Sequence, residues 1–327
     1  MAEPKLTKNE RREQAREQAR VAREAEKKRE KRNRLYLQGG VLLGVLAILA
    51  IVALVLTQAV KPAGPGPENM ASGGVTFTKD LAVVPTPALA EGAERVAVES
   101  DWETLPVDMT VFVDYMCPAC GNFEGQYGSF LESNVGKGDV NLTVYPINFL
   151  DNQSAGTKYS TRAGNLMSCV VNSDPDHAFA LHNLLLSEEV QPQEGTTGLT
   201  DDQLLEQAEA AGVDVTTEIR QCVKTQKFAD FINGNTKQAL EVGVIGLADG
   251  ARMVRASTDQ LTGEEESDFQ PADEPQRVVS TPTVIVNGQQ WWPARDQGLE
   301  NYLLTIISNL SGNGTDGAEE SATSEDS

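Results

Sequence analysis

The pattern of hydrophobic and polar positions separates one long apolar stretch from a region where short apolar runs alternate with helix-like patterns. Residues 35–60 contain no charged side chain, and positions 41–56 are apolar except for Gly44. As a helix, these 26 residues would reach about 39 Å, enough to cross a hydrocarbon core of about 30 Å. We therefore predict a transmembrane helix over residues 35–60. A cleaved signal peptide is the alternative, but this apolar run exceeds the usual length of about 7–15 residues and the Ala-x-Ala cleavage site is poor.

Beyond a Pro-, Gly- and Ala-rich linker at 61–74, the pattern predicts strands on both sides of a mainly helical stretch. Strands are predicted at 107–114, 140–145, 283–287 and 289–292, and short ones at 75–77 and 95–98. Helices are predicted at 124–135, 157–172, 176–190, 200–211, 216–240 and 296–310. We interpret residues 151–242, approximately, as a helical insertion between two parts of one sheet.

Two segments fall outside this pattern. Residues 247–279 are rich in acidic side chains and show no clear periodicity, as is typical of a loop that is functional or disordered. A surface loop that shapes access to a site and a merely tolerated insertion both fit this segment. Residues 311–327 are rich in Ser, Gly and Glu, and we predict a disordered acidic tail.

Charge is distributed unevenly along the chain. Residues 1–34 hold 13 Lys and Arg against 7 Asp and Glu, whereas the rest of the chain holds 14 against 41. A basic segment next to an apolar span is typical of the cytoplasmic side, so we predict a cytoplasmic tail at 1–34 and an extracytoplasmic acidic domain. That acidity argues against nucleic acid or anionic lipid as a partner of the outer domain. Nucleic-acid binding by the basic tail would need more than a run of charge.

The most informative motif is Cys117-Pro118-Ala119-Cys120, which lies where a predicted strand gives way to a helix. A sulfur at a helix N-terminus is favoured as thiolate by the unpaired N–H groups and the macrodipole. Cys120 follows one turn later, close enough to close a disulfide with Cys117. All four cysteines lie on the predicted outer side, which fits an oxidising compartment.

A zinc site is the competing interpretation of a C-x-x-C pair. Zinc would need two further ligands at suitable spacing. The remaining candidates form no second tight pair: Cys169, Cys222, His177 and His182. We therefore favour redox chemistry and predict no metal.

Two motifs together resemble the DsbA-like branch of the thioredoxin superfamily. They are Phe-Val-Asp-Tyr-Met-Cys-Pro-Ala-Cys at 112–120 and Thr-Pro-Thr-Val-Ile-Val-Asn-Gly at 281–288. The resemblance covers about residues 75–310 and implies an α/β thioredoxin-like fold with an inserted helical domain. It also implies a cis peptide bond at Thr281-Pro282, which would place the Thr281 backbone opposite Cys117. The catalytic residues it implies are Cys117, Cys120, Thr281 and Pro282.

The resemblance carries further expectations about the other two cysteines and about cofactors. Certain actinobacterial DsbA-like proteins have a structural disulfide inside the helical domain, and Cys169 with Cys222 would correspond to it. Two unpaired buried cysteines are the alternative. No organic cofactor is expected.

The chain departs from the family pattern at two places. The family's Gly-Val-x-Gly stretch, here at 243–246, normally leads almost directly into Thr-Pro, whereas this chain places the 247–279 segment between them. Family oxidases also often carry His where this chain has Ala119, so a weaker oxidant is compatible with the sequence.

Four other side chains receive local interpretations. Asp114, in the Asp-Tyr pair before the motif, either helps to move protons or only ends the strand. Glu124 is expected to be a solvated helix residue. Of Trp291 and Trp292, one is expected in the core and one on the surface.

These observations lead to one function and two alternatives. We predict a monomeric, single-pass membrane protein whose outer domain donates disulfides to unfolded secreted proteins. A quinone-linked membrane oxidase would reoxidise it, as the family implies. A reductase or isomerase in the same compartment is the first alternative, because sequence does not fix the direction of electron flow. A non-catalytic binding or chaperone module is the second.

Overall fold

The computed structural model describes residues 20, 23, 27–29, 64–98, 101–257, 261, 265–296 and 298–319, with side chains up to residue 312. The predicted membrane helix at 35–60, nearly all of the basic tail at 1–34 and the end of the acidic tail lie outside these residues. Within the described residues, no helix combines the length and the apolar character needed to span a membrane. The chain divides into two compact units, Met1–Pro62 and Ala63–Ser327, and every described strand belongs to the second.

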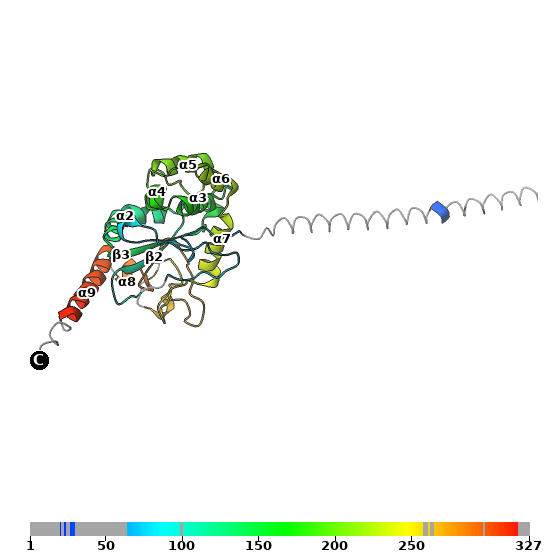
Figure 1. Ribbon diagram of the computed structural model, residues 1–327. Coiled ribbons are helices and arrows are strands. Elements are labelled where there is room, and N and C mark those ends of the chain that lie inside the picture. The colour runs from blue at the N-terminus through cyan, green and yellow to red at the C-terminus, as the bar shows by residue number, and fades with distance from the viewer. Residues whose placement is uncertain are drawn as a thin grey trace, which may run out of the picture. The chain divides into compact units, whose positions relative to one another are not determined.

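A mixed five-stranded sheet forms the centre of the second unit (Figure 1). Its strands lie in the order β1-β3-β2-β4-β5. Their bounds are Val75–Phe77 for β1, Val107–Val113 for β2, Val140–Pro146 for β3, Thr283–Val286 for β4 and Gln289–Trp291 for β5. β2 runs parallel to β3 and antiparallel to β4, so Phe112 lies opposite both Tyr145 and Thr283. The end of β2 and the beginning of β4 therefore meet at one edge of the sheet.

Alternating side chains of the strands fill two separate cores, as the period of a strand requires. Met109, Val111 and Val113 face a large core that also contains residues of two long helices, α2 (Pro118–Lys137) and α9 (Leu299–Glu319). Phe112, Tyr145 and Ile285 face the other side, where they pack with Met253 and Val278. The second face of the sheet is thus covered partly by the 247–279 segment.

The helical insertion consists of five α-helices between β3 and β4. In the described part of the second unit, the α-helices are α2 at Pro118–Lys137, α3 at Tyr159–Ser173, α4 at Ala178–Leu186, α5 at Asp201–Ala210, α6 at Thr217–Thr225, α7 at Ala229–Lys237, α8 at Pro293–Asp296 and α9 at Leu299–Glu319. Short 3-10 turns lie at Lys79–Leu81, Asp151–Gln153, Pro175–His177 and Glu266–Asp268, and a π-helical turn at Gln238–Val242 extends α7. The insertion, α3 to α7, gathers largely to one side of the sheet in Figure 1.

Two local features hold the insertion together. Cys169 on α3 and Cys222 on α6 form a disulfide with an S–S distance of 2.01 Å and a Cα–Cα distance of 6.0 Å. Thr200 begins α5 with a capping box, in which its hydroxyl accepts from the Gln203 N–H and the Gln203 side chain accepts from the Thr200 N–H. The predicted thioredoxin-like architecture with inserted helices is confirmed.

The structure corrects the expectation for the two tryptophans. Both Trp291 and Trp292 are buried. The reason is the 247–279 segment, whose Val254 and Phe269 pair as an isolated β-bridge and pack against Trp292. This segment therefore adds a small core of its own to the sheet. Residues 95–98, by contrast, form no strand.

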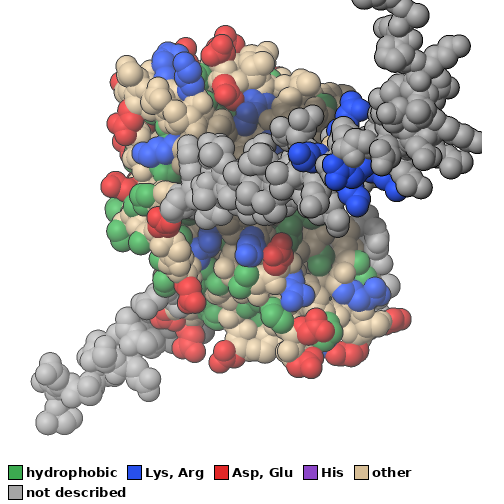
Figure 2. Space-filling view, turned by 90° about the vertical axis from the view of Figure 1, so that its right-hand side faces the viewer, with side chains coloured by type: hydrophobic (Ala, Val, Ile, Leu, Met, Phe, Trp, Pro, Cys, Tyr) green, Lys and Arg blue, Asp and Glu red, His purple; other side chains and the backbone are tan. Residues whose placement is uncertain are grey.

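Acidic side chains do not gather in one patch on the face seen in Figure 2. Several Asp and Glu side chains lie near the edges of that face, with Lys and Arg between them. The excess of acidic residues beyond position 34 opposes polyanionic partners through its summed charge.

Candidate redox site

The sheet topology brings the two sequence motifs together. β2 ends at Val113, and four residues later Cys117 forms the N-cap of α2, with Pro118 in the first turn. Because β4 is antiparallel to β2, its first residues lie beside the end of β2. The Thr281-Pro282 peptide bond is cis, and the Sγ of Cys117 donates to the carbonyl oxygen of Thr281 at 3.3 Å.

The two thiols of the pair lie in contrasting electrostatic surroundings. Both are free and buried. The pKa of Cys117 is lowered to about 6. The largest cause is a hydrogen bond with the Cys120 thiol, and hydrogen bonds with Thr281 and with the backbone N–H groups of Ala119 and Cys120 act in the same direction. Together these hydrogen bonds outweigh burial, which alone would raise the pKa. Burial, followed by the hydrogen bond and charge of Cys117, raises the pKa of Cys120 well above its ordinary value. At neutral pH the pair is therefore one thiolate and one thiol, as nucleophilic exchange requires.

Asp114 is fully buried just before the pair. Its carboxylate accepts hydrogen bonds from the backbone N–H groups of Met116 and Leu150, each at 2.8 Å. The pKa of Asp114 is raised to about 7, mainly by burial and to a smaller extent by the charge of Cys117. Hydrogen bonds from Ser160 and from the N–H groups of Met116 and Leu150 oppose this rise. Asp114 thus fixes the turn between β2 and the motif, and it also titrates near neutral pH beside a reactive sulfur.

A buried polar network connects the motif with the insertion. The Tyr115 hydroxyl lies 3.2 Å from Nδ1 of His182 on α4, and Nε2 of His182 lies 3.5 Å from a carboxylate oxygen of Glu124 on α2. The Glu124 side chain is only 11% exposed, so the expectation of a solvated residue is wrong. The reason is that α4 covers this face of α2.

The remaining zinc candidates are occupied elsewhere. Nδ1 of His177 lies 2.8 Å from a carboxylate oxygen of Asp174, and Cys169 is bonded to Cys222. Throughout the described residues, no group of three or more His, Cys, Asp or Glu side chains is placed to hold a metal ion.

A groove of about 400 Å³ runs beside the redox pair. Ala119 and one side of α2 form one wall, and the residues around the cis peptide bond form another. Ser257, from the 247–279 segment, also lines it. The described residues that line the groove are all uncharged: Ala119, Asn122, Phe123, Gln126, Tyr127, Ser257, Ser280, Thr281, Pro282, Thr283, Val284, Gln290, Trp291 and Pro293.

Comparison with known proteins agrees with this geometry. Residues 103–246 match a family described as Thioredoxin. The predicted resemblance is confirmed. The matched region contains the Cys117–Cys120 motif and the helical insertion, and this part of the chain is similar to the thioredoxin family. The site combines a first thiol of lowered pKa, a buried second thiol of raised pKa and the Thr281 carbonyl beside them, an arrangement suited to thiol–disulfide exchange.

Individual relatives include both a kinase and disulfide oxidoreductases. The serine/threonine-protein kinase PknE of Mycobacterium tuberculosis is 31% identical over 134 residues, which are 40% of this chain. This match spans only 23% of that kinase's length. Among solved structures, DsbG of M. tuberculosis in its reduced form is 23% identical, with a TM-score of 0.48, over 78% of this chain and 95% of that one. Reduced DsbA of M. tuberculosis is 22% identical, with a TM-score of 0.48, over 77% and 100%.

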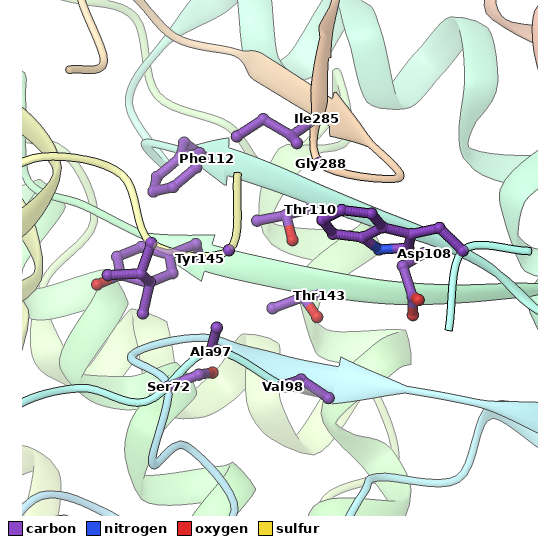
Figure 3. A pocket seen from close by; sticks show the side chains of 13 residues that line it. Ser72, Ala97, Val98, Asp108, Thr110, Phe112, Thr143, Tyr145, Ile285 and Gly288 are labelled. Carbon is purple, nitrogen blue, oxygen red and sulfur yellow. The ribbon is translucent and has the colours of Figure 1, made fainter. Parts of the chain in front are cut away.

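A second cavity, of about 70 Å³, lies on the other face of the sheet (Figure 3). It is lined by side chains of β2 and β3, including Asp108, Thr110 and Thr143, and by Trp102. Neither redox cysteine lines it. Burial raises the pKa of Asp108, and a hydrogen bond from the Asn141 side chain partly offsets this rise.

Sequence reasoning did not identify two polar side chains that reach the motif from the helical insertion. His182 was considered only as a zinc ligand, and Gln191 was not considered. The Gln191 side chain donates to the carbonyl oxygen of Cys117 at 2.9 Å. One signal was available: Gly121 directly follows the motif inside a helix, and glycine there often marks a close neighbour.

Proposed function

We propose that this protein is an extracytoplasmic disulfide oxidase that passes the Cys117–Cys120 disulfide to unfolded secreted proteins. The single observation that carries the proposal is the unequal pair of thiols, in which the pKa of Cys117 is lowered and that of the neighbouring Cys120 is raised. A thiol that is stable as thiolate is a good leaving group, and its stability favours the reduced enzyme over the disulfide form. A reduced form that is favoured in this way makes the disulfide form an oxidant.

The reaction proceeds by two exchanges. A substrate thiolate attacks the Cys117 sulfur of the enzyme disulfide, so a mixed disulfide forms and Cys120 leaves as a thiolate that takes up a proton. A second thiolate of the same substrate then attacks the substrate sulfur of the mixed disulfide. Cys117 leaves as a thiolate, the substrate gains a disulfide, and the enzyme has accepted two electrons. We propose that a quinone-linked membrane oxidase removes these electrons.

The uncharged groove supports a substrate that is an unfolded polypeptide. An extended chain can pair with the backbone at Thr281 as an added strand, and such pairing recognises main chain and not side chains. The groove offers amides, hydroxyls and aromatic rings, which suit many neutral sequences. This arrangement favours broad substrate selection.

Support for the location comes from the sequence and from the second disulfide. The apolar stretch at 35–60, preceded by basic residues, favours a single membrane anchor with the N-terminus in the cytoplasm. The Cys169–Cys222 disulfide is typical of a protein that folds in an oxidising compartment.

A reductase or isomerase role is the second candidate, and Ala119 is the residue that favours it. Ala119 is exposed and carries no polar group that could stabilise the Cys117 thiolate. If such stabilisation is too small, the pair would reduce disulfides and not form them.

The test uses the purified full-length chain in detergent and a reduced, unfolded model protein whose activity depends on its disulfides. The oxidised wild type should restore that activity, and Cys117→Ala should abolish the restoration. The double variant Cys169→Ala/Cys222→Ala is the matched control, because it loses two cysteines but keeps the redox pair, and it should still oxidise the substrate.

The direction of electron flow is tested by equilibrium with glutathione. The proposed oxidase should be reduced almost completely by a glutathione buffer in which stable structural disulfides persist. If that buffer instead oxidises the Cys117–Cys120 pair, the result would favour the reductase role. Unchanged refolding support in Cys117→Ala would favour the binding module.

A further inference from the structure

Gln191 reaches the redox motif from the end of α4. The backbone there is fixed by a turn after the helix, in which the N–H of Gln191 donates to the Ser187 carbonyl at 2.9 Å. The Gln191 side-chain amide donates to the carbonyl oxygen of Cys117 at 2.9 Å and approaches that of Tyr115 at 3.4 Å. A residue of the helical insertion thus contacts the main chain of the nucleophile itself.

The first turn of α2 is shaped to receive this side chain. A Cβ atom added at Gly121 would lie 2.2 Å from Oε1 of Gln191 and 3.1 Å from the carbonyl oxygen of Leu186. The distance to Oε1 of Gln191 is shorter than real Cβ atoms essentially ever show, so a side chain at this position would displace Gln191. The glycine therefore costs the helix some intrinsic stability, and in return it lets α4 and Gln191 lie against the motif.

The carbonyl that Gln191 holds also begins the helix. The same oxygen accepts from the N–H groups of Cys120 at 2.9 Å and Gly121 at 3.2 Å. Pro118 has no N–H, so the first N–H groups that can face the sulfur are those of Ala119 and Cys120, and both stabilise the Cys117 thiolate. Fixing the Cys117 carbonyl fixes the peptide plane from which this turn starts.

Pro118 and Ala119 place no polar side chain between the two cysteines. We propose that Gln191 is a positioning residue of the redox site, which holds the Cys117 carbonyl so that the first N–H groups of α2 stay directed at the sulfur. The inference rests on the proposed function for its biological meaning, because it assigns to the helical insertion the control of the same thiol. It concerns the geometry of the dithiol and can be measured without any substrate.

The experiment is an ultraviolet titration of the thiolate in the reduced full-length protein. Gln191→Met keeps the length of the side chain and removes the donor. It should raise the pKa of Cys117 by about half a unit to one unit, the size expected for one neutral hydrogen bond. Gly121→Ala displaces the Gln191 side chain and should raise the pKa in the same direction.

The double variant Gly121→Ala/Gln191→Met sharpens the test. If both changes act through one contact, their effects on the pKa are not additive, and the double variant should titrate close to Gln191→Met alone. Gln203→Ala is the matched control: it removes a glutamine of the same insertion and weakens the α5 cap without touching the motif. It should lower thermal stability and leave the Cys117 titration unchanged.

The outcomes separate the two proposals. A Gln191→Met protein that titrates like the wild type while melting earlier, as Gln203→Ala does, would mean that Gln191 only stabilises the fold, and the inference would be wrong. A raised pKa in Gln191→Met supports the positioning role, even if the wild type fails to oxidise unfolded proteins. If the pKa is raised but the wild type does not oxidise unfolded proteins, the proposed function is wrong and the positioning role of Gln191 is still supported.

Discussion

The molecule contains two cysteine pairs that are almost equally buried but differ in every other respect. Cys117 is 7% exposed and Cys222 is 6% exposed, while Cys120 and Cys169 are completely buried. Burial therefore does not distinguish a reactive pair from a structural one. The difference lies in the backbone and in the polar groups around the sulfurs.

The structural pair joins two helix interiors. Cys169 and Cys222 lie well inside α3 and α6, where the N–H groups are used within the helices. The redox pair instead begins a helix, faces the carbonyl of Thr281 and is approached by polar side chains from the insertion. A sulfur becomes reactive because unpaired donors face it, and each of the following predictions changes one part of this contrast.

The largest expected effect is the pH dependence of the redox pair. The fold lowers the pKa of Cys117 from 9.0 to about 6, so the thiolate adds stability to the reduced protein above the unfolded pKa, and this stability is lost as pH falls through the folded pKa. The disulfide form has no such thiol. The reduced form should gain stability over the oxidised form between pH 6 and pH 9, by at most about 4 kcal/mol. Urea unfolding of both forms across this range measures the gain.

Asp114 does not produce the same signal. Its raised pKa removes stability as pH rises towards about 7, but it titrates in both redox forms and largely cancels from their difference. Cys117→Ser, which cannot form the disulfide or this thiolate, should lose the stabilisation between pH 6 and pH 9. A difference between the wild-type forms that stays flat over this range would contradict the assigned electrostatics.

The Cys169–Cys222 disulfide, by contrast, should contribute to stability independently of pH. Cys169→Ala/Cys222→Ala should lower the free energy of unfolding by about 2–4 kcal/mol, because the bond constrains the unfolded chain. This loss should not vary between pH 6 and pH 9. Urea unfolding at both pH values checks the prediction, and a loss that follows the titration of a thiol would show that the two pairs are coupled.

The same contrast explains how much the sequence could reveal. The redox pair and the sheet were predictable because their signals are local: a motif at the end of an apolar run, and further apolar runs with the period of a strand. The cis peptide bond at Thr281-Pro282 was expected only from the family resemblance, because the Thr-Pro sequence alone also fits a trans bond. The surroundings of α2 were not predictable, because nothing in its own sequence states which face α4 covers. Glu124 was therefore taken as solvated, and Gln191 was not considered.

The 247–279 segment shows the same limit in another part of the fold. Its acidic residues suggested a surface loop, yet Val254 and Phe269 pack against Trp292 and bury it. A few apolar residues scattered through a polar segment show no helical or strand period, so the sequence does not indicate what they pack against. Their contact with Trp292 is apparent only in the tertiary fold. Ser257 then follows Val254 closely enough to reach the groove.

The smallest expected effect tests whether the polar network beside the redox pair is satisfied as one unit. Tyr115→Phe leaves Nδ1 of His182 buried without this partner and should cost about 1–3 kcal/mol of unfolding free energy. His182→Leu should cost a similar amount, because the Tyr115 hydroxyl and Glu124 then lose their contact.

The double variant Tyr115→Phe/His182→Leu should cost clearly less than the sum of the two single changes, because it removes both members of the Tyr115–His182 hydrogen bond and only the lost contact of Glu124 remains. Tyr127→Phe provides the control. Tyr127 is a buried tyrosine on α2 whose hydroxyl shows no hydrogen bond to any residue that the structure describes, and its change should be nearly neutral. Additive losses in urea unfolding would mean that the Tyr115 and His182 groups act independently. The polar surroundings of the reactive pair would then be a set of separate contacts and not one network that links the insertion to the motif.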